Sequence, residues 1–150
     1  MSNIKSIKLL KANKNFRPLP VDEGDEIYRN GIFHFNITKM VDYIRRRPDE
    51  FMLELIAIKD YSAGFSLIDE NYLDSVVNFE PVILAEITPG RYNLIDGNHR
   101  AEKARRLGKE KLMAYKLKVN QHIKFLTTQR AYAAYIEYWN DKIKGMKEVV

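Results

Sequence analysis

The sequence predicts an α+β fold. Stretches with the alternation of β-strands are interspersed with stretches of helical periodicity, and a two-residue turn joins one pair of predicted strands into an antiparallel hairpin. The chain has 150 residues, of which 45% are hydrophobic, so it is long and apolar enough to bury a core. We therefore expect residues 1–150 to form one domain.

The beginning of the chain predicts a strand followed by an acidic loop. Residues 4–11 alternate in a way that favours a strand, and the prolines of segment 17–20 exclude a helix interior. Four acidic residues then surround a glycine: Asp22, Glu23, Asp25 and Glu26. We expect them to lie in an exposed loop, which would be able to hold a divalent cation if it lay near an anion site.

A helix is predicted over residues 37–47. Asn36 is a good N-cap after the Asn30-Gly31 turn, apolar residues recur at helical spacing, and Pro48 ends the helix. Its last turn carries three consecutive arginines, Arg45, Arg46 and Arg47. Because cations at this end complement the helix dipole, we expect these arginines to have a structural role rather than to contact nucleic acid.

The middle of the chain is less clear. Residues 51–58 form a nearly unbroken apolar run, which fits a buried strand as well as a helix, and the pattern leaves both open. A loop is expected over residues 61–64. Asp69 is then the predicted N-cap of a short helix that ends at Asn78.

A hairpin and a helix follow. Residues 81–87 predict a buried strand, Pro89-Gly90 a turn, and residues 92–95 the return strand. The next helix has a small apolar stripe that we expect to pack against the sheet, formed by Ala101, Ala104 and Leu107. Gly108 is its predicted end.

The last part of the chain predicts a strand and a long helix. Residues 112–119 alternate as a half-exposed strand, and residues 128–144 have helical spacing. One face of this helix is rich in aromatic residues and carries Tyr132, Tyr135, Ile136, Trp139 and Ile143. We expect this face to lie in the core, or to form a homodimer contact through Tyr132, Tyr135 and Trp139, rather than to stack nucleic-acid bases. His34 and His122 are isolated, and we expect them in the core or on the surface rather than on a metal.

Composition excludes several classes of protein. The net charge of +5 favours an anionic partner without the dense basic stripe of a DNA-wrapping protein. The absence of cysteine excludes disulfides, a thiolate nucleophile and cysteine-ligated zinc. No apolar run approaches the roughly 20 residues that span a bilayer, and the first residues lack the apolar core of a secretory signal. We therefore expect a soluble, cytoplasmic protein without a membrane partner.

The hairpin leads into Asp96-Gly97-Asn98-His99-Arg100 at the start of a helix. A helix N-terminus presents unpaired backbone N–H groups, and a glycine lets a phosphate approach the main chain. A carboxylate beside a phosphate would be repelled unless a cation or a transferring proton lay between them. We therefore expect phosphate binding at Gly97, Asn98, His99 and Arg100, catalysis at Asp96 and His99, and a metal ion at Asp96.

A structural explanation of the same five residues stays open. Asn98 would then be an ordinary N-cap, His99 a surface residue and Asp96 a turn former.

Residues 79–119 resemble the ParB/sulfiredoxin superfamily. The matching text is Glu80-Pro81-Val82-Ile83-Leu84 for the first strand, Gly90 to Arg100 for the return strand and the phosphate motif, and Ala101 to Gly108 for the helix. The resemblance implies a compact domain with a small mixed sheet. It also implies a bound nucleoside triphosphate or diphosphate, such as ATP, ADP or CTP, together with Mg²⁺.

Members of this superfamily differ in chemistry. Partition proteins hydrolyse CTP, sulfiredoxin phosphorylates a sulfinic acid with ATP, and free-serine kinases phosphorylate a small hydroxyl amino acid. Sulfiredoxin needs a cysteine in the motif, which this chain lacks, and partition proteins carry Glu-Arg-Arg after the glycine instead of Asn98-His99-Arg100. The Asp-Gly-His-His-Arg form of the serine kinases differs from this chain only at Asn98.

Three functions follow from these residues. The first is a Mg²⁺-dependent phosphotransferase or nucleotide hydrolase, with a small molecule as the acceptor of a transferred phosphate. The second is a non-catalytic binding module that responds to a nucleotide. The third is a nucleic-acid-binding protein or nuclease, which rests on the net charge and on a nuclease label sometimes attached to the family.

Overall fold

The computed structural model describes residues 8–61, 68–76 and 78–149. Its helices and strands, in chain order, are β1 (Ile27–Asn30), β2 (Phe33–Asn36), α1 (Ile37–Arg46), β3 (Met52–Ala57), α2 (Glu70–Ser75), β4 (Val82–Thr88), β5 (Arg91–Asp96), α3 (Asn98–Arg106), β6 (Lys111–Leu117), α4 (Val119–His122) and α5 (Gln129–Val149). Short 3₁₀ turns lie at η2 (Pro48–Glu50), η3 (Ile58–Tyr61) and η4 (Ile123–Phe125).

The central sheet is mixed and has the strand order β3-β6-β4-β5. Strand β4 pairs antiparallel with β5 and parallel with β6, while β3 pairs antiparallel with β6. Strands β1 and β2 form a separate two-stranded hairpin. This arrangement confirms the predicted α+β class, the predicted 81–95 hairpin and the small mixed sheet.

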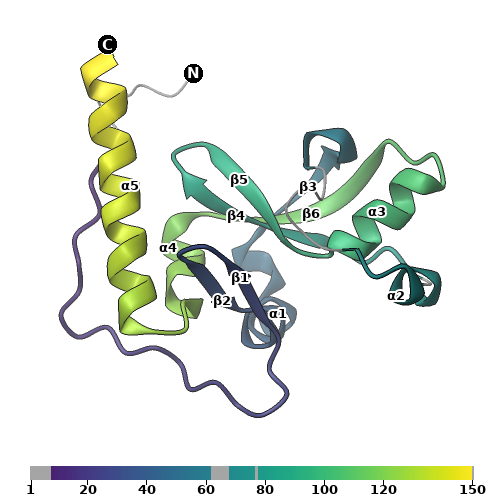
Figure 1. The fold of residues 1–150 in the computed structure, drawn as a ribbon, viewed down its shortest axis with the longest axis horizontal. Coiled ribbons are helices and arrows are strands. Elements are labelled where there is room, and N and C mark those ends of the chain that lie inside the picture. Colours follow the sequence, from purple (N-terminus) through teal and green to yellow (C-terminus); the bar gives the residue numbers. More distant parts are fainter. Residues whose placement is uncertain (1–7, 62–67, 77, 150) are drawn as a thin grey trace.

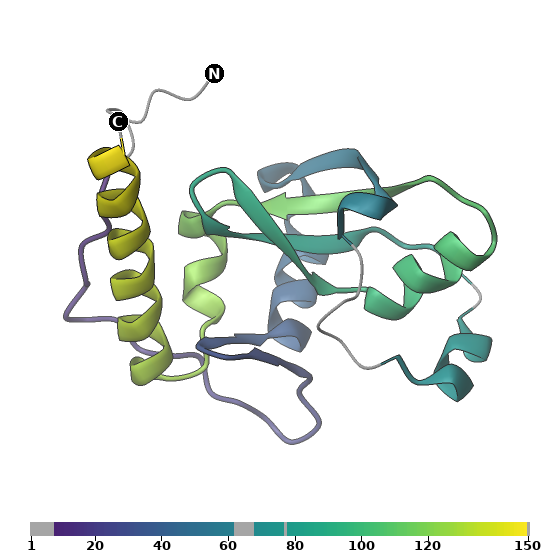
Figure 2. The ribbon, with the colours of Figure 1, turned by 45° about the horizontal axis from the view of Figure 1, so that its top comes forward.

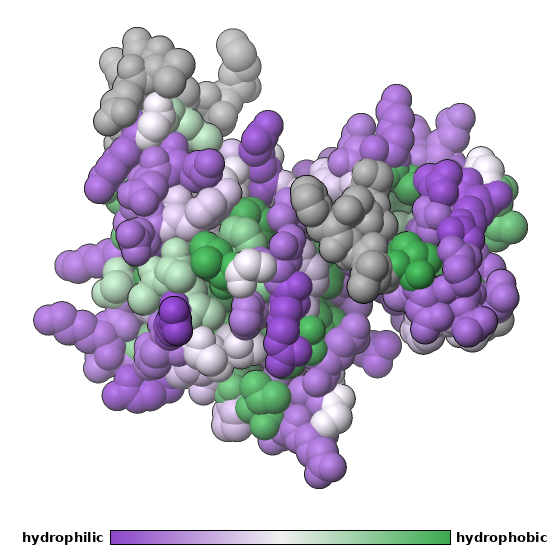
Figure 3. All heavy atoms as spheres, in the orientation of Figure 1, coloured by the Kyte–Doolittle hydropathy of each residue, from purple (hydrophilic) through white to green (hydrophobic). Residues whose placement is uncertain are grey.

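Helices cover both faces of the sheet. Helix α3 packs on one face, and α1, α4 and α5 lie on the other, so that α5 and the α2–α3 pair stand at opposite ends of the molecule (Figures 1 and 2). The space-filling view shows a mostly hydrophilic surface at the α2–α3 end (Figure 3). Because helices pack on both faces of the sheet, the chain has two separate hydrophobic cores. We call them the α5-side core and the α3-side core, after a helix that packs on each face.

Strand β4 takes part in both cores, because its apolar side chains alternate between the two faces. Ile83, Ala85 and Ile87 belong to the α5-side core, whereas Val82 and Leu84 belong to the α3-side core. A strand that is covered on both faces has a continuous apolar sequence, and this explains why residues 81–87 predict a buried strand.

The aromatic face of α5 packs in the interior of the chain. Five residues of that face are buried in the α5-side core: Tyr132, Tyr135, Ile136, Trp139 and Ile143. The core interpretation of this stripe is confirmed, because Tyr132, Tyr135 and Trp139 are buried within the single chain. Although α5 has 21 residues, no helix in the described part of the chain is long and apolar enough to cross a membrane.

Helix α1 confirms the predicted helix and its caps. The Asn36 side chain accepts a hydrogen bond from the backbone N–H of Lys39 at 3.1 Å, and the helix ends at Arg46, two residues before Pro48. Of the ambiguous run 51–58, the central part forms strand β3. It is not a buried strand, because β3 lies at the edge of the sheet and residues 52–55 are exposed.

Several predicted boundaries are wrong. Residues 8–11 form no strand, and residues 4–7 of the predicted first strand lie outside the described residues, as do residues 62–64 of the predicted loop. The short helix after Asp69 ends at Ser75 rather than at Asn78. There the Lys103 ammonium of α3 donates to the carbonyl oxygens of Asp74 and Val76, so a tertiary contact takes the place of the next helical turn.

Three other differences have local causes. Strand β1 and helix α4 have only four residues each, too few to produce a periodic pattern. The predicted strand 112–119 ends at Leu117, because Lys118 is the N-cap of α4, which begins at Val119. Leu107 was expected to pack against the sheet with Ala101 and Ala104, but it is 61% exposed, because α3 ends at Arg106 and Leu107 leaves the helical stripe.

His122 is fully buried, and its ring packs against Phe35 and Tyr135, so it lies in the core, one of the two placements expected for it. Its Nε2 lies 2.7 Å from the backbone carbonyl oxygen of Glu86, which also accepts a hydrogen bond from the Tyr135 hydroxyl at 2.6 Å. Nδ1 is buried and has no partner among the described residues. Burial therefore lowers the pKa of His122 to about 4, because protonation would place a charge and an unsatisfied N–H in the core.

We expect the free energy of unfolding to fall by roughly 3 kcal/mol between pH 6.5 and pH 4 through His122 alone. The unfolded chain binds a proton at His122 below pH 6.5, whereas the folded chain binds it only near pH 4. The contribution of His122 to the free energy of unfolding is therefore fully present above pH 6.5 and is lost as the pH falls toward 4. Denaturant unfolding across this range measures the effect. His122→Gln keeps a donor for Glu86 but does not titrate, and an unchanged pH slope in this variant would contradict the assignment.

Candidate functional site

The site is built where β5 turns into α3. Gly97 occupies the turn with φ +99°, a left-handed conformation that side-chain-bearing residues rarely adopt. A Cβ on Gly97 would lie 2.5 Å from Cγ1 of Val82 and 2.9 Å from Nη2 of Arg100. The turn therefore packs directly against β4, and glycine is required there for both conformation and space.

The first turn of α3 carries no side-chain cap. Gly97 is the N-cap residue, and it has no side chain to accept from the N–H groups that follow. Asn98 lies inside the helix as its first residue, so the alternative that Asn98 is an ordinary N-cap is wrong. The helix start thus keeps its backbone donors and the positive end of its dipole for another acceptor.

Arg100 ties the motif to the start of β4. Its Nε donates to the carbonyl oxygen of Glu80 at 3.1 Å, and its Nη2 donates to that of Pro81 at 3.2 Å. Nη2 also lies 3.4 Å from Oδ2 of Asp96, which makes a half-buried ion pair. Most of the guanidinium is therefore committed to the protein, and only Nη1 makes no hydrogen bond to the described residues.

His99 connects α3 with α2. Its Nε2 accepts a hydrogen bond from the backbone N–H of Asp69 at 3.1 Å, and its ring stands edge-on to Tyr72 with 4.7 Å between the ring centroids. An Nε2 that accepts implies a neutral ring with the proton on Nδ1. His99 is thus held in a fixed position with one N–H left to donate.

Two cavities meet at this motif. The smaller one, of about 800 Å³, is lined by residues 26–29, by Asp69 and Tyr72, and by residues 95–100. The larger one, of about 1230 Å³, lies between α1, the start of β4 and η4. Three side chains line both cavities and mark their junction: Glu26, Asp96 and Arg100.

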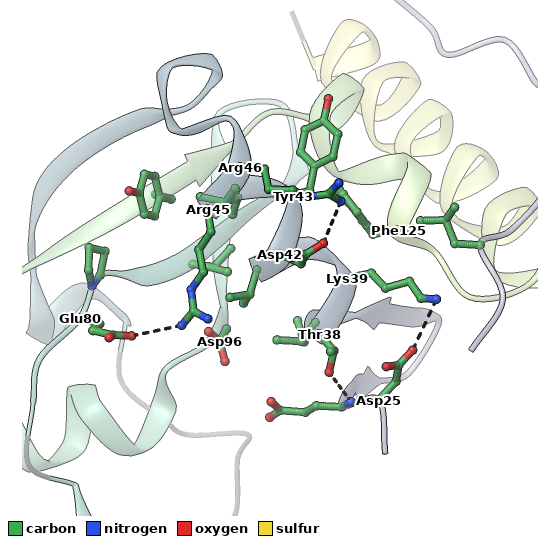
Figure 4. Close-up of a pocket in the computed structure, with 18 of the residues that line it drawn as sticks. Asp25, Thr38, Lys39, Asp42, Tyr43, Arg45, Arg46, Glu80, Asp96 and Phe125 are labelled. Atoms are coloured by element: carbon green, nitrogen blue, oxygen red, sulfur yellow. Dashed lines mark hydrogen bonds and ion pairs between the residues drawn. The ribbon is translucent and has the colours of Figure 1, made fainter. Parts of the chain in front are cut away.

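The larger cavity carries charges of both signs. Arg45 of α1 points toward Glu80, with 3.7 Å between the charged groups, and Arg46 pairs with Asp42 at 2.8 Å (Figure 4). Both arginines are exposed and ion-paired, which agrees with a structural role.

The acidic loop supplies a site residue that its sequence did not single out. Asp25 accepts from the Asn36 amide at 2.9 Å, and Lys39 pairs with Asp22 at 2.8 Å, so these two acidic residues hold the loop against α1. The backbone N–H of Glu26 donates to the Thr38 hydroxyl at 2.7 Å. This bond places Glu26 at the junction of the two cavities, which no local pattern predicts.

Glu26 and Asp96 form a pair of interacting carboxylates. Partial burial and the charge of Asp96 raise the pKa of Glu26, while Arg100 and His99 oppose that shift. Glu26 remains open to solvent, which screens the effect. The junction thus holds two carboxylates that repel each other and would be stabilised by a cation between them.

The described residues contain no group of three or more acidic or histidine side chains that could hold a metal ion by itself. The four acidic residues of the loop therefore do not make up such a group. Asp96 and Glu26 are the carboxylates that a cation shared with bound phosphates would contact, since Mg²⁺ is commonly held by one or two carboxylates and substrate oxygens.

No protein-family model, curated protein or solved structure matches this chain.

Replacement of Gly97 by alanine tests the packing of this turn. We expect Gly97→Ala to lower the free energy of unfolding by about 2–4 kcal/mol, because the new methyl group would overlap Val82 in a left-handed conformation. Gly108→Ala is the matched control: its φ is +82°, but nothing lies within 4 Å of the added Cβ, so it would lose only about 1–2 kcal/mol. Equal losses in thermal unfolding would show that the contact with β4 is unimportant.

Proposed function

We propose that this chain binds a nucleoside triphosphate or diphosphate at the start of α3 and acts as a Mg²⁺-dependent phosphotransferase or nucleotide hydrolase. The observation that carries the proposal is the uncapped first turn of α3, which opens into a cavity whose lining includes the carboxylates of Glu26 and Asp96. The resemblance of residues 79–119 to the ParB/sulfiredoxin superfamily supports it, and we propose a domain of that type.

The first turn of α3 has features that suit a phosphate. Its backbone N–H groups are not capped by a side chain, because Gly97 is the N-cap residue, and the positive end of the helix dipole favours an anion. The cavity of about 800 Å³ is within the range of ligand pockets, which is about 300–1,000 Å³. Tyr72, which is 56% exposed and lines the same cavity, is an aromatic surface for a base or ribose.

The residues of the motif would have different roles. Asn98 and His99 would bind phosphate oxygens, His99 through the N–H of Nδ1. Arg100 would act mainly as a positioning residue, since its guanidinium already holds Glu80 and Pro81, with Nη1 left for a phosphate. Asp96 and Glu26 would hold Mg²⁺ or orient the attacking hydroxyl group. When bound, Mg²⁺ neutralises charge that develops on the phosphate oxygens.

The two cavities suggest how two reactants would meet. A nucleotide in the smaller cavity would direct its terminal phosphate toward the junction at Glu26 and Asp96. A small acceptor, or water, would reach the same point through the larger cavity. Phosphoryl transfer depends mostly on such positioning and on charge neutralisation.

One observation favours a second candidate, a non-catalytic module that binds a nucleotide. Asp96 is ion-paired with Arg100 in the free protein, so its carboxylate is already engaged and is less available to a metal ion or to an attacking hydroxyl group. A protein of this kind would be stabilised by the nucleotide without forming product.

A panel of nucleotides tests both candidates. With Mg²⁺, we expect ATP, ADP or CTP to raise the thermal unfolding temperature, and we expect Asp96→Asn to reduce product formation at least about 100-fold while binding persists. Asp141→Asn, an exposed position on α5, is the control and should change neither quantity.

The outcomes separate the candidates. Stabilisation of the wild-type protein without any product would support the binding module. If no nucleotide stabilises the protein with or without Mg²⁺, the proposed function is wrong.

Replacement of Glu26 by glutamine should stabilise the fold and impair turnover together. The raised pKa of Glu26 means that the folded chain binds its proton more tightly than the unfolded chain, so the ionised carboxylate destabilises the fold at neutral pH. The increase in the free energy of unfolding caused by Glu26→Gln should therefore be largest at neutral pH and should vanish below the ordinary glutamate pKa of 4.5. A variant that is stabilised equally at pH 4 and pH 7 would refute this explanation.

A further inference from the structure

Strand β3 is an apolar edge of the central sheet. It pairs with β6 on one side only, and the described residues supply no strand on its other side. Met52, Leu53 and Leu55 are 53%, 47% and 54% exposed. An exposed edge strand with apolar side chains is a template for pairing with another strand.

The hydrogen-bond pattern shows which backbone groups are free at this edge. The backbone N–H of Ile58 donates to the carbonyl oxygen of Glu110 at 2.9 Å, so the pair 58–110 is a hydrogen-bonded pair of the β3–β6 ladder. Hydrogen-bonded pairs alternate in an antiparallel ladder, so the backbone groups of residues 52, 54 and 56 point toward β6. Those of Leu53, Leu55 and Ala57 therefore point away from the sheet.

The usual protection of an edge strand is missing in β3. Native edges are commonly blocked by lysine, proline or a bulge, and Met52–Ala57 contains neither of these residues and pairs with β6 in continuous register. The single charged residue of the strand, Glu54, pairs with Lys116 of β6 at 2.9 Å. This ion pair reduces the carboxylate charge that a second strand would meet, although the partly exposed carboxylate keeps part of that charge.

We propose that β3 pairs antiparallel with β3 of a second copy of this chain. The two central sheets, each of four strands, would join into one continuous sheet across a two-fold axis. We choose a second copy as the partner because the edge is complementary to itself. Its outward backbone groups lie at alternate residues, so two copies can exchange hydrogen bonds, and the exposed apolar side chains of one copy meet those of the other.

The charge of Glu54 selects the register. Residues that face each other across the two-fold axis must lie on the same face of the sheet, so the axis passes through residue 54 or residue 55. An axis at Glu54 would place two carboxylates directly opposite each other, which is unfavourable. An axis at Leu55 places Leu55 opposite Leu55 and Leu53 opposite Ala57, with their outward backbone groups forming the hydrogen bonds.

Sedimentation of the full chain over a range of concentrations tests the association. We expect a concentration-dependent dimer, and we expect Leu55→Lys to weaken it at least about tenfold, because two ammonium groups would face each other. Leu107→Lys is the matched control: Leu107 is equally exposed but lies at the end of α3, so the dimer should be unaffected. Circular dichroism and thermal unfolding establish that each variant folds.

Single cysteines test the register, because the chain has none of its own. With the axis at Leu55, the Cα atoms of two residues 55 would lie about 5.5 Å apart, which permits a disulfide. Leu55→Cys should therefore cross-link on oxidation, whereas Glu54→Cys, at a diagonal distance of about 7–8 Å, and Leu107→Cys should not.

Three results would overturn the proposal: a wild-type chain that stays monomeric at its highest soluble concentration, a dimer that Leu55→Lys leaves intact, or cross-linking as efficient through Leu107→Cys as through Leu55→Cys.

Discussion

The contact between Gly97 and Val82 is the constraint on which the site depends. It brings the turn after β5 against β4, in the layer where the α3-side core begins, and this sets the direction in which α3 leaves the sheet. Ala101 and Ala104 of α3 are small enough to continue the same close packing. Because the turn is a bare glycine, the packing that fixes α3 also leaves its first backbone donors without a cap. The direction of α3 and its uncapped first turn therefore arise from the same contact.

Arg100 and His99 extend this constraint to the surroundings. Arg100 binds the carbonyl oxygens just before β4, and His99 accepts from the backbone of Asp69 at the start of α2. Both side chains hold neighbouring segments in place around the motif. The floor of the proposed nucleotide site is thus held by several hydrogen bonds. The acidic loop that carries Glu26 is in turn attached to α1 by hydrogen bonds and ion pairs. The proposed site thus combines the start of α3 with a carboxylate that comes from a different element.

Much of the fold was predictable because its signals are local. The 81–95 hairpin, the helix capped by Asn36 and the aromatic face of the last helix are each encoded by turn residues, caps or periodicity within a short stretch. The elements that were not predicted are those without a local signal. Strand β1 exists because it pairs with β2, the exposed position of β3 follows from its place at the sheet edge, and α2 stops where Lys103 of α3 meets its last carbonyl groups.

The glycine turn with Asp96, Asn98, His99 and Arg100 after a hairpin is predictable from the sequence, since the turn, the strands and the helix are all encoded within one continuous segment. The surroundings of that segment depend on tertiary packing. Packing brings Glu26 and Asp96 to the lining of the same cavity, commits most of the Arg100 guanidinium to the protein, and leaves β3 at the sheet edge. The physical reason is that each of these features joins residues far apart in the chain, and such contacts form only when the helices and strands pack together.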